Sequence, residues 1–149
     1  MDKVEFKNWK LKEVARYIEV VSHDSDNYFE YLINKLNIPL TDHESTNREN
    51  TYIDWLKTSN YFKFYFDGDG EEKENEIAFK NSKLNTKDRI IINYGYNEPA
   101  VLVPTDIFIE DWEDFIASTQ YETIIISEDL ELIMEVSRDY YLHSNFRIK

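Results

Sequence analysis

Carboxylates are the most abundant side chains in this sequence that could do chemistry. The 149 residues include 30 Asp and Glu but only 17 Lys and Arg, which gives a formal net charge of −13. The excess gathers in one segment, since eleven acidic residues lie between Asp106 and Asp139 and the only basic residue there is Arg138. A surface with this pattern focuses negative potential and speeds the encounter with a basic protein.

We expect this segment to form an acidic face that binds a basic partner. Exposed aromatic rings beside acids favour such binding, because rings are readily desolvated in a contact and carboxylates hold Arg or Lys. The candidate partner-binding residues are Glu110, Asp111, Glu113, Asp114, Tyr121, Glu128, Asp129 and Glu131, with Asp106, Glu122 and Glu135 in reserve. The alternative is a solvated face that only keeps the protein soluble, and the sequence leaves both interpretations open.

Other residue types that support catalysis or metal binding are absent or wrongly spaced. The chain contains no Cys, and its three glycines do not form a phosphate-binding loop. None of the three histidines has metal-site spacing, and we expect them at or near the surface. The run from Asp67 to Glu76 fails as a calcium loop because Tyr65 would occupy its first ligand position, so we expect a hairpin turn. We therefore expect no catalytic residue, no cofactor and no metal.

The elements that must position the acids follow from the spacing of apolar residues. Helical spacing predicts helices over about 11–21, 25–38, 46–56 and 105–118, with Ser25 and Thr105 as caps and Pro39 ending the second helix. Alternation and β-branched or aromatic runs predict strands over about 61–66, 76–80, 89–94, 100–103, 123–127, 130–136 and 140–148. For 130–136 a helix is the competing interpretation. The three tryptophans are expected in the core.

The fold class expected from this order of elements is α+β. N-terminal helices would pack on a mostly antiparallel sheet, with one further helix at about 105–118 and a C-terminal β-meander. The length matches a single domain spanning residues 1–149.

A small, cysteine-free, strongly acidic α+β protein rich in aromatic residues resembles the bacterial immunity proteins of polymorphic-toxin and contact-dependent growth inhibition systems. The residues behind this resemblance are the stretch Trp112-Glu113-Asp114-Phe115 and the acidic region from Ser127 to Asp139. The similarity is one of type across the whole chain. It implies a non-enzymatic inhibitor that binds and blocks a cognate toxin, often a basic nuclease, in the cytoplasm.

Composition also bears on location and on rival functions. Residues 1–7 contain no apolar stretch for secretion and the longest apolar runs are too short to span a bilayer, so we expect a cytoplasmic protein without a membrane partner. The negative charge argues against binding nucleic acid. The alternatives are an acidic nucleic-acid mimic that inhibits a DNA-binding enzyme and a general protein-interaction domain, while an enzyme with buried carboxylates is the least favoured. The oligomeric state stays open.

Overall fold

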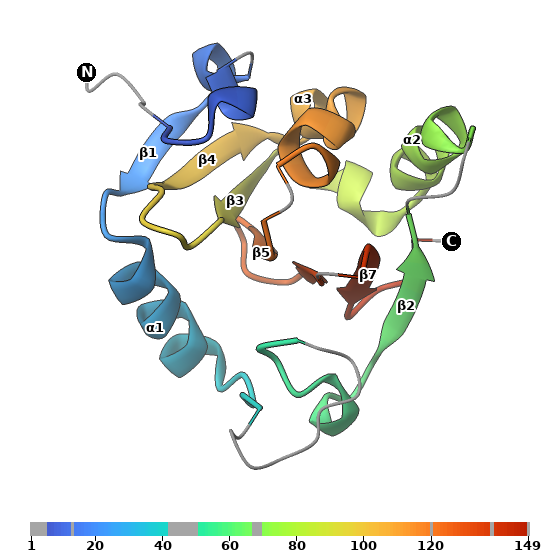
Figure 1. Ribbon diagram of the computed structural model, residues 1–149. Helices are drawn as coiled ribbons and strands as arrows, with labels where there is room; N and C mark the ends of the chain where they lie inside the picture. Colours follow the sequence, from blue (N-terminus) through green and yellow to red (C-terminus); the bar gives the residue numbers. More distant parts are fainter. Residues whose placement is uncertain are drawn as a thin grey trace.

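An antiparallel sheet organises the chain (Figure 1). The computed structural model describes residues 6–12, 14–41, 51–66, 70–119, 121–137 and 139–148. Within them, seven strands pair in the order β1-β4-β3-β5-β6-β7-β2, and every pairing is antiparallel. The strands are β1 (Glu19–Ser22), β2 (Phe62–Tyr65), β3 (Arg89–Asn93), β4 (Ala100–Pro104), β5 (Thr123–Ser127), β6 (Ile133–Val136) and β7 (Tyr141–Ser144).

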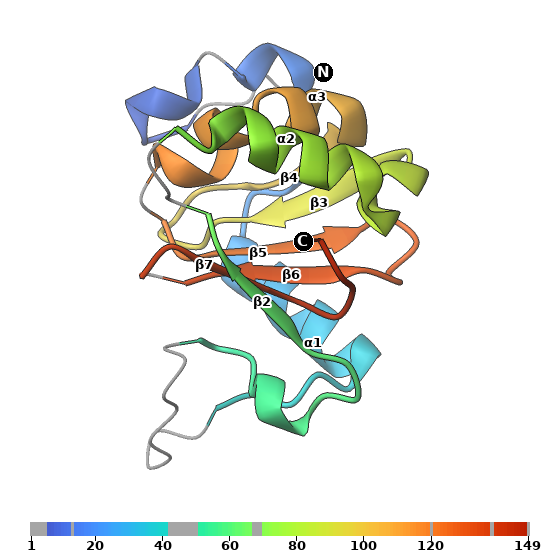
Figure 2. The same ribbon diagram turned by 90° about the vertical axis from the view of Figure 1, so that its right-hand side faces the viewer.

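Helices cover both faces of this sheet (Figure 2). The α-helices are α1 (Ser25–Leu36), α2 (Glu72–Asn81) and α3 (Thr105–Glu110), and a π-helical turn, η5 (Glu113–Ala117), follows α3. Short 3₁₀ turns are η1 (Trp9–Lys12), η2 (Ala15–Tyr17), η3 (Trp55–Lys57) and η4 (Lys83–Thr86). One face of the sheet, the α2/α3 face, is covered by α2, α3, η5 and the N-terminal turns, while α1 and η3 cover the opposite α1 face. The expected α+β class and the C-terminal meander of β5, β6 and β7 are confirmed.

The central strand β5 shows why the sheet needs two helical layers. Ile125 packs into the cluster on the α2/α3 face, whereas Ile124 and Ile126 pack into the cluster on the α1 face. All five residues of β5 are buried, because a sheet with helices on both faces has no solvated side. Antiparallel pairing also defines two ends of the sheet. We call the end where β5 begins the entry end, and strands β3, β6 and β2 finish there. The opposite end, where the chain turns from β5 into β6, is the exit end.

Most elements predicted from the sequence are present, with shorter bounds. The strands expected over 61–66, 89–94, 100–103 and 123–127 are confirmed, as are the helix beginning at 105 and the choice of a strand over a helix for 130–136. Thr105 is not the predicted cap of that helix, because it is the first helical residue and follows Pro104 at the cap position. The last strand covers only Tyr141–Ser144 of the expected 140–148. Helix α1 is confirmed, but its cap is Asp24 rather than Ser25, since the Asp24 side chain accepts a hydrogen bond from the Asn27 amide at 3.0 Å.

The helix predicted over 11–21 is wrong. The segment forms η1 and η2 and then enters β1, which pairs with β4 at the edge of the sheet. Leu11, Val14 and Ile18 are buried as their spacing suggested, but Val21 is exposed. The spacing of these three buried residues fits two consecutive 3₁₀ turns as well as it fits one helix. The β-branched residues Val20 and Val21 then favour the edge strand β1. Trp9, expected in the core, is 70% exposed, while Trp55 and Trp112 are buried.

The strand predicted over 76–80, and with it the hairpin after β2, is also wrong. These residues belong to α2, in which Glu76 forms ion pairs with Lys73 and Lys80, both at 3.0 Å. Such pairs at three- and four-residue spacing favour a helix. The predicted third helix shrinks to η3, while its capping pair, Thr46 and Glu49, and the turn residues Asp67-Gly68-Asp69 lie outside the described residues. In the part of the chain that is described, no helix combines the length and apolar character needed to cross a bilayer.

Candidate functional site

Four of the predicted partner-binding acids line one hollow at the entry end, on the α2/α3 face. This acidic groove has a volume of about 430 Å³ and lies between the start of α2 and the end of α3. Its described lining consists of Gly70, Glu72, Lys73, Glu76, Glu110, Asp111, Trp112, Glu113 and Asp114. Six carboxylates therefore converge with one ammonium group, so the groove is a concentrated site of negative potential.

The positive charge of Lys73 acts on only one of these six carboxylates. Lys73 forms an ion pair with Glu76 at 3.0 Å, and Lys80 forms a second one with the same carboxylate. Burial raises the pKa of Glu113, and the negative charges of Glu72 and Asp114 raise it further. Like charges held this close destabilise the ionised state, so a bound cation would be stabilised here.

Trp112 fixes the position of these acids. Its ring packs edge-on against Phe66 with centroids 6.0 Å apart, and it also contacts the ring of Phe79. The Trp112 indole Nε1 donates a hydrogen bond to the carbonyl oxygen of Glu72 at 3.2 Å. This bond joins the start of α2 to the segment between α3 and η5, and it keeps acids from both elements at one opening.

The predicted acids Glu128, Asp129 and Glu131 lie elsewhere, in and beside the β5–β6 turn at the exit end. Arg89 pairs with Glu128 at 2.9 Å, and Lys87 lies 2.6 Å from Asp129 and 3.1 Å from Glu131. Lys83 also pairs with Glu131. Hydrogen bonds from Lys87 and Ser127 lower the pKa of Asp129 to about 2. Three basic side chains from η4, the residue after it and β3 thus neutralise these acids within the chain.

Tyr121 stands apart from both groups. It is half-buried two residues before β5, and its ring stacks on that of Tyr96 with centroids 4.7 Å apart. Its hydroxyl donates to Glu98 Oε2 at 3.4 Å. The eight predicted residues therefore occupy three places: Glu110, Asp111, Glu113 and Asp114 line the acidic groove, the three turn acids lie at the exit end, and Tyr121 lies apart from both.

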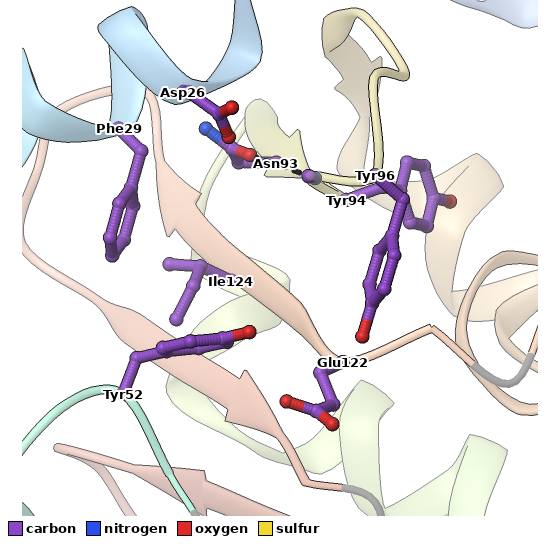
Figure 3. Close-up of a pocket in the computed structure, with 9 residues that line it drawn as sticks. Asp26, Phe29, Tyr52, Asn93, Tyr94, Tyr96, Glu122 and Ile124 are labelled. Carbon is purple, nitrogen blue, oxygen red and sulfur yellow. Dashed lines mark hydrogen bonds between the residues drawn. The ribbon is translucent and has the colours of Figure 1, made fainter. Parts of the chain in front are cut away.

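A second hollow, the aromatic pocket, lies at the same end of the sheet but on the α1 face (Figure 3). Its volume is about 280 Å³, and its described lining is Asp26, Phe29, Tyr52, Asn93, Tyr94, Gly95, Tyr96, Glu122 and Ile124. The residues come from α1, β3 and the loop after it, the start of β5, and the segment before η3. The sequence suggests Glu122 only as a reserve residue for binding, and its pattern does not group these rings because they are distant along the chain.

Two buried polar groups on the α1 face were also missed. Glu135, kept in reserve as a surface acid, is 1% exposed, and it accepts hydrogen bonds from the amides of Tyr52 and Ile53 and from the Trp55 indole, at 2.7, 3.1 and 3.0 Å. His143, expected near the surface, is fully buried, with Nδ1 2.8 Å from the Tyr61 hydroxyl and Nε2 3.0 Å from Ser137 Oγ. Both groups hold the segment before β2 against the sheet.

The contacts of His143 do not form a nucleophile triad. Asp139 contacts the Ser137 hydroxyl rather than the imidazole, and both Ser137 and His143 are buried. A triad requires the acid to orient the histidine and the hydroxyl to face the substrate. Among the described residues, no group of three or more His, Cys, Asp or Glu side chains is arranged to hold a metal ion.

Glu135 makes stability depend on pH. Burial raises its pKa to about 7, against the lowering effect of its three hydrogen bonds, and the charge of Glu122 adds to the rise. The folded protein therefore binds a proton more tightly than the unfolded chain, so this contribution to stability is present below about pH 4.5 and is lost as the pH rises through about 7. We expect the wild-type protein to lose about 3 kcal/mol relative to Glu135→Gln between about pH 5 and pH 8. Urea unfolding of both proteins measures this difference, and a constant difference across that range would contradict the assignment.

Comparison with known proteins adds no relative. No family model matches the sequence, and no curated protein matches it significantly. The chemistry of the acidic groove and of the aromatic pocket is therefore the basis for assigning function.

Proposed function

We propose that this chain is a non-enzymatic inhibitory protein that binds a basic protein partner through the acidic groove. The observation that carries the proposal is that six carboxylates, from α2 and from the stretch Glu110–Asp114, line one groove with a single lysine that is paired with Glu76. Such a surface attracts Lys and Arg side chains at long range and holds them through charge-assisted hydrogen bonds in contact. Trp112 would give the centre of the contact a rigid base.

The resemblance to bacterial immunity proteins supplies the finer part of the proposal. The partner would be a cognate basic toxin, such as a nuclease, whose cationic cleft the groove acids would occupy in the cytoplasm. Glu110, Asp111, Glu113 and Asp114 remain the proposed contact residues. Glu128, Asp129 and Glu131 are given a lesser role because Lys83, Lys87 and Arg89 already neutralise them.

A nucleic-acid mimic receives less support. A mimic would need two rows of acids spread over much of the surface in place of the two phosphate backbones. Of the two clusters formed by the predicted acids, the turn cluster is neutralised by three bases, which leaves the groove as one local concentration of negative charge. A local patch favours a contact with a basic protein face.

Charge reversal in the groove tests the proposal. We expect the triple variant Glu110→Lys, Glu113→Lys and Asp114→Lys to associate at least about tenfold more slowly at low salt with the proposed basic partner, which is to be sought among the products of the neighbouring genes. The deficit should shrink as salt screens the charges. Stopped-flow association rates across a salt series provide the measurement.

A matched control separates local steering from total charge. Glu19→Lys, Glu30→Lys and Asp88→Lys make the same charge change at exposed positions outside the groove. We expect this control to lose much less of the association rate. Equal losses in the two triple variants, or no loss in either, would overturn the role of the groove.

A further inference from the structure

The aromatic pocket is built from rings around an apolar floor, with a carboxylate on each of two sides. Figure 3 shows Phe29 and Tyr52 beside Ile124, Tyr96 across from them, Asp26 at one side of the opening and Glu122 at the other. Tyr94 also borders the pocket, but its ring packs into the cluster on the α2/α3 face and its hydroxyl donates to the Phe115 carbonyl at 2.8 Å. The pocket therefore offers ring faces and two negative groups to a ligand.

The loop after β3 holds Tyr96 in an unusual backbone conformation. Gly95, Tyr96 and Asn97 have φ angles of 68°, 52° and 62°, so three consecutive residues are left-handed. Glycine and asparagine tolerate this region, but tyrosine rarely adopts it. The Tyr96 ring is stabilised by stacking on Tyr121, with the two planes 10° apart. Strain of this kind is common at binding sites, where the surrounding structure imposes a side-chain position.

The charge of the pocket selects the kind of ligand. None of its described lining residues is Lys, Arg or His, while Asp26 and Glu122 are both acidic. Tyr52 shares a hydrogen bond with Glu122, and the pKa of Tyr52 is raised by burial first and then by the negative charge of Glu122. An anionic ligand would be repelled here, and a neutral one would gain no charge attraction from the two carboxylates.

We propose that the aromatic pocket binds an organic cation, namely an ammonium or guanidinium group on an aliphatic chain. The aliphatic chain would lie on Ile124 and Phe29, and the positive group would meet the faces of Tyr52 and Tyr96 and the Glu122 carboxylate. Cations are attracted to aromatic faces, most strongly where water is partly excluded, and carboxylates add charge-assisted hydrogen bonds. The volume of about 280 Å³ suits a single side chain or a small amine.

This site is independent of the acidic groove. The pocket lies on the α1 face and the groove on the α2/α3 face, and the two share no lining residue. A basic protein could supply the cation as a Lys or Arg side chain, and a free amine could supply the same group. The proposal concerns the positive group that both sources share, and the probes below distinguish a protein side chain from a free amine.

Titration of the full chain with small probes, followed by the amide NMR signals of the loop after β3, tests the proposal. The probes are agmatine as a free cation, N-acetyl-arginine methylamide as a protein-like side chain, and pentanol and pentanoate as neutral and anionic controls. We expect at least one cation to bind about tenfold or more tightly than both controls. Tighter binding of agmatine would indicate a free amine, and equal or tighter binding of the blocked arginine would indicate a protein side chain.

Two variants locate the binding. Glu122→Gln removes the charge but keeps a hydrogen-bonding group for Tyr52, and Tyr96→Leu removes a ring face but keeps apolar volume. We expect each to weaken cation binding about tenfold, while Glu30→Gln, on an exposed part of α1, and the groove triple variant leave it unchanged. Thermal midpoints near the wild-type value verify folding. Cations that bind no better than pentanol, or that bind both pocket variants as well as wild type, would overturn the proposal.

Discussion

Replacing Glu135 with alanine is expected to destabilise the protein by about 4 kcal/mol. The carboxylate is almost completely buried and accepts hydrogen bonds from the amides of Tyr52 and Ile53 and from the Trp55 indole. Its removal leaves buried donors without an acceptor, and each such donor costs about 1–3 kcal/mol. A loss of this size is a large fraction of the stability of an ordinary domain, about 5–15 kcal/mol.

The measurement is the free energy of unfolding from urea titration at fixed pH. Glu135→Gln should lose about half as much as the alanine variant, because one amide oxygen can still accept from Ile53 and Trp55 while its NH₂ group faces a donor. Glu74→Ala, at an exposed position of α2, is the matched control and should change stability by less than about 0.5 kcal/mol. An alanine variant within about 1 kcal/mol of wild type would show that Glu135 does not hold the 51–57 segment.

Glu135 also illustrates what the sequence could not reveal. In the alternating run from Leu130 to Val136, an acidic residue between apolar ones suggested a side facing solvent. The alternation was right, since β6 is a strand with Met134 and Val136 on the α2/α3 face. The opposite side is covered because Trp55 and Ile53 pack there from about 80 residues earlier in the chain. No local pattern in the sequence records that contact.

The fold could be predicted from the sequence in segments where the apolar residues follow a single period, either helical or alternating. The stripe of α1 and the β-branched runs of β3 and β5 correspond to single elements in the structure. Prediction failed in the segment 11–21, where buried residues three or four apart fit either tight turns or a helix, and in α2, whose sequence from Glu72 to Asn81 has a weak apolar pattern. In the segment 11–21 the deciding contact is the pairing of β1 with the distant strand β4, whereas α2 is favoured by the local ion pairs of Glu76 with Lys73 and Lys80.

The candidate site also has a part that could be predicted from the sequence and a part that could not. The clustering of Glu110, Asp111, Glu113 and Asp114 follows from helical geometry within a short segment, so it was visible in the sequence. The separation of Glu128 to Glu131 from them arises because β5 carries the chain across the sheet, from the entry end to the exit end. Their neutralisation by Lys83, Lys87 and Arg89 depends on residues about 40 positions earlier. Charge counted along the sequence therefore overestimates the charge available to a partner.

Glu98 provides the second large effect, because it anchors the N-terminal turns to the sheet. Its carboxylate is completely buried and accepts hydrogen bonds from the amides of Lys7 and Asn8 at 2.7 and 2.9 Å. These donors precede η1, so the carboxylate acts on the start of this turn as a capping residue does. Glu98→Ala is expected to lose about 3 kcal/mol, since two amides lose their acceptor and Tyr121 loses its contact.

The loss should concentrate in the N-terminal segment rather than spread over the sheet. Leu11 and Val14 are buried against the α2/α3 face, but the amides of Leu11 and Tyr17 bond only within the turns, to Asn8 and Val14. Once Glu98 is removed, the turns are held by apolar packing and by the Asn8 side-chain amide, which donates to the Thr119 carbonyl at 3.2 Å, so local opening becomes easier than global unfolding. Hydrogen exchange should therefore speed up at Leu11 and Tyr17 more than in α1, with Glu98→Gln showing a smaller change. Uniform acceleration in both regions would instead mean that the turns and the sheet unfold as one unit and that Glu98 stabilises the whole.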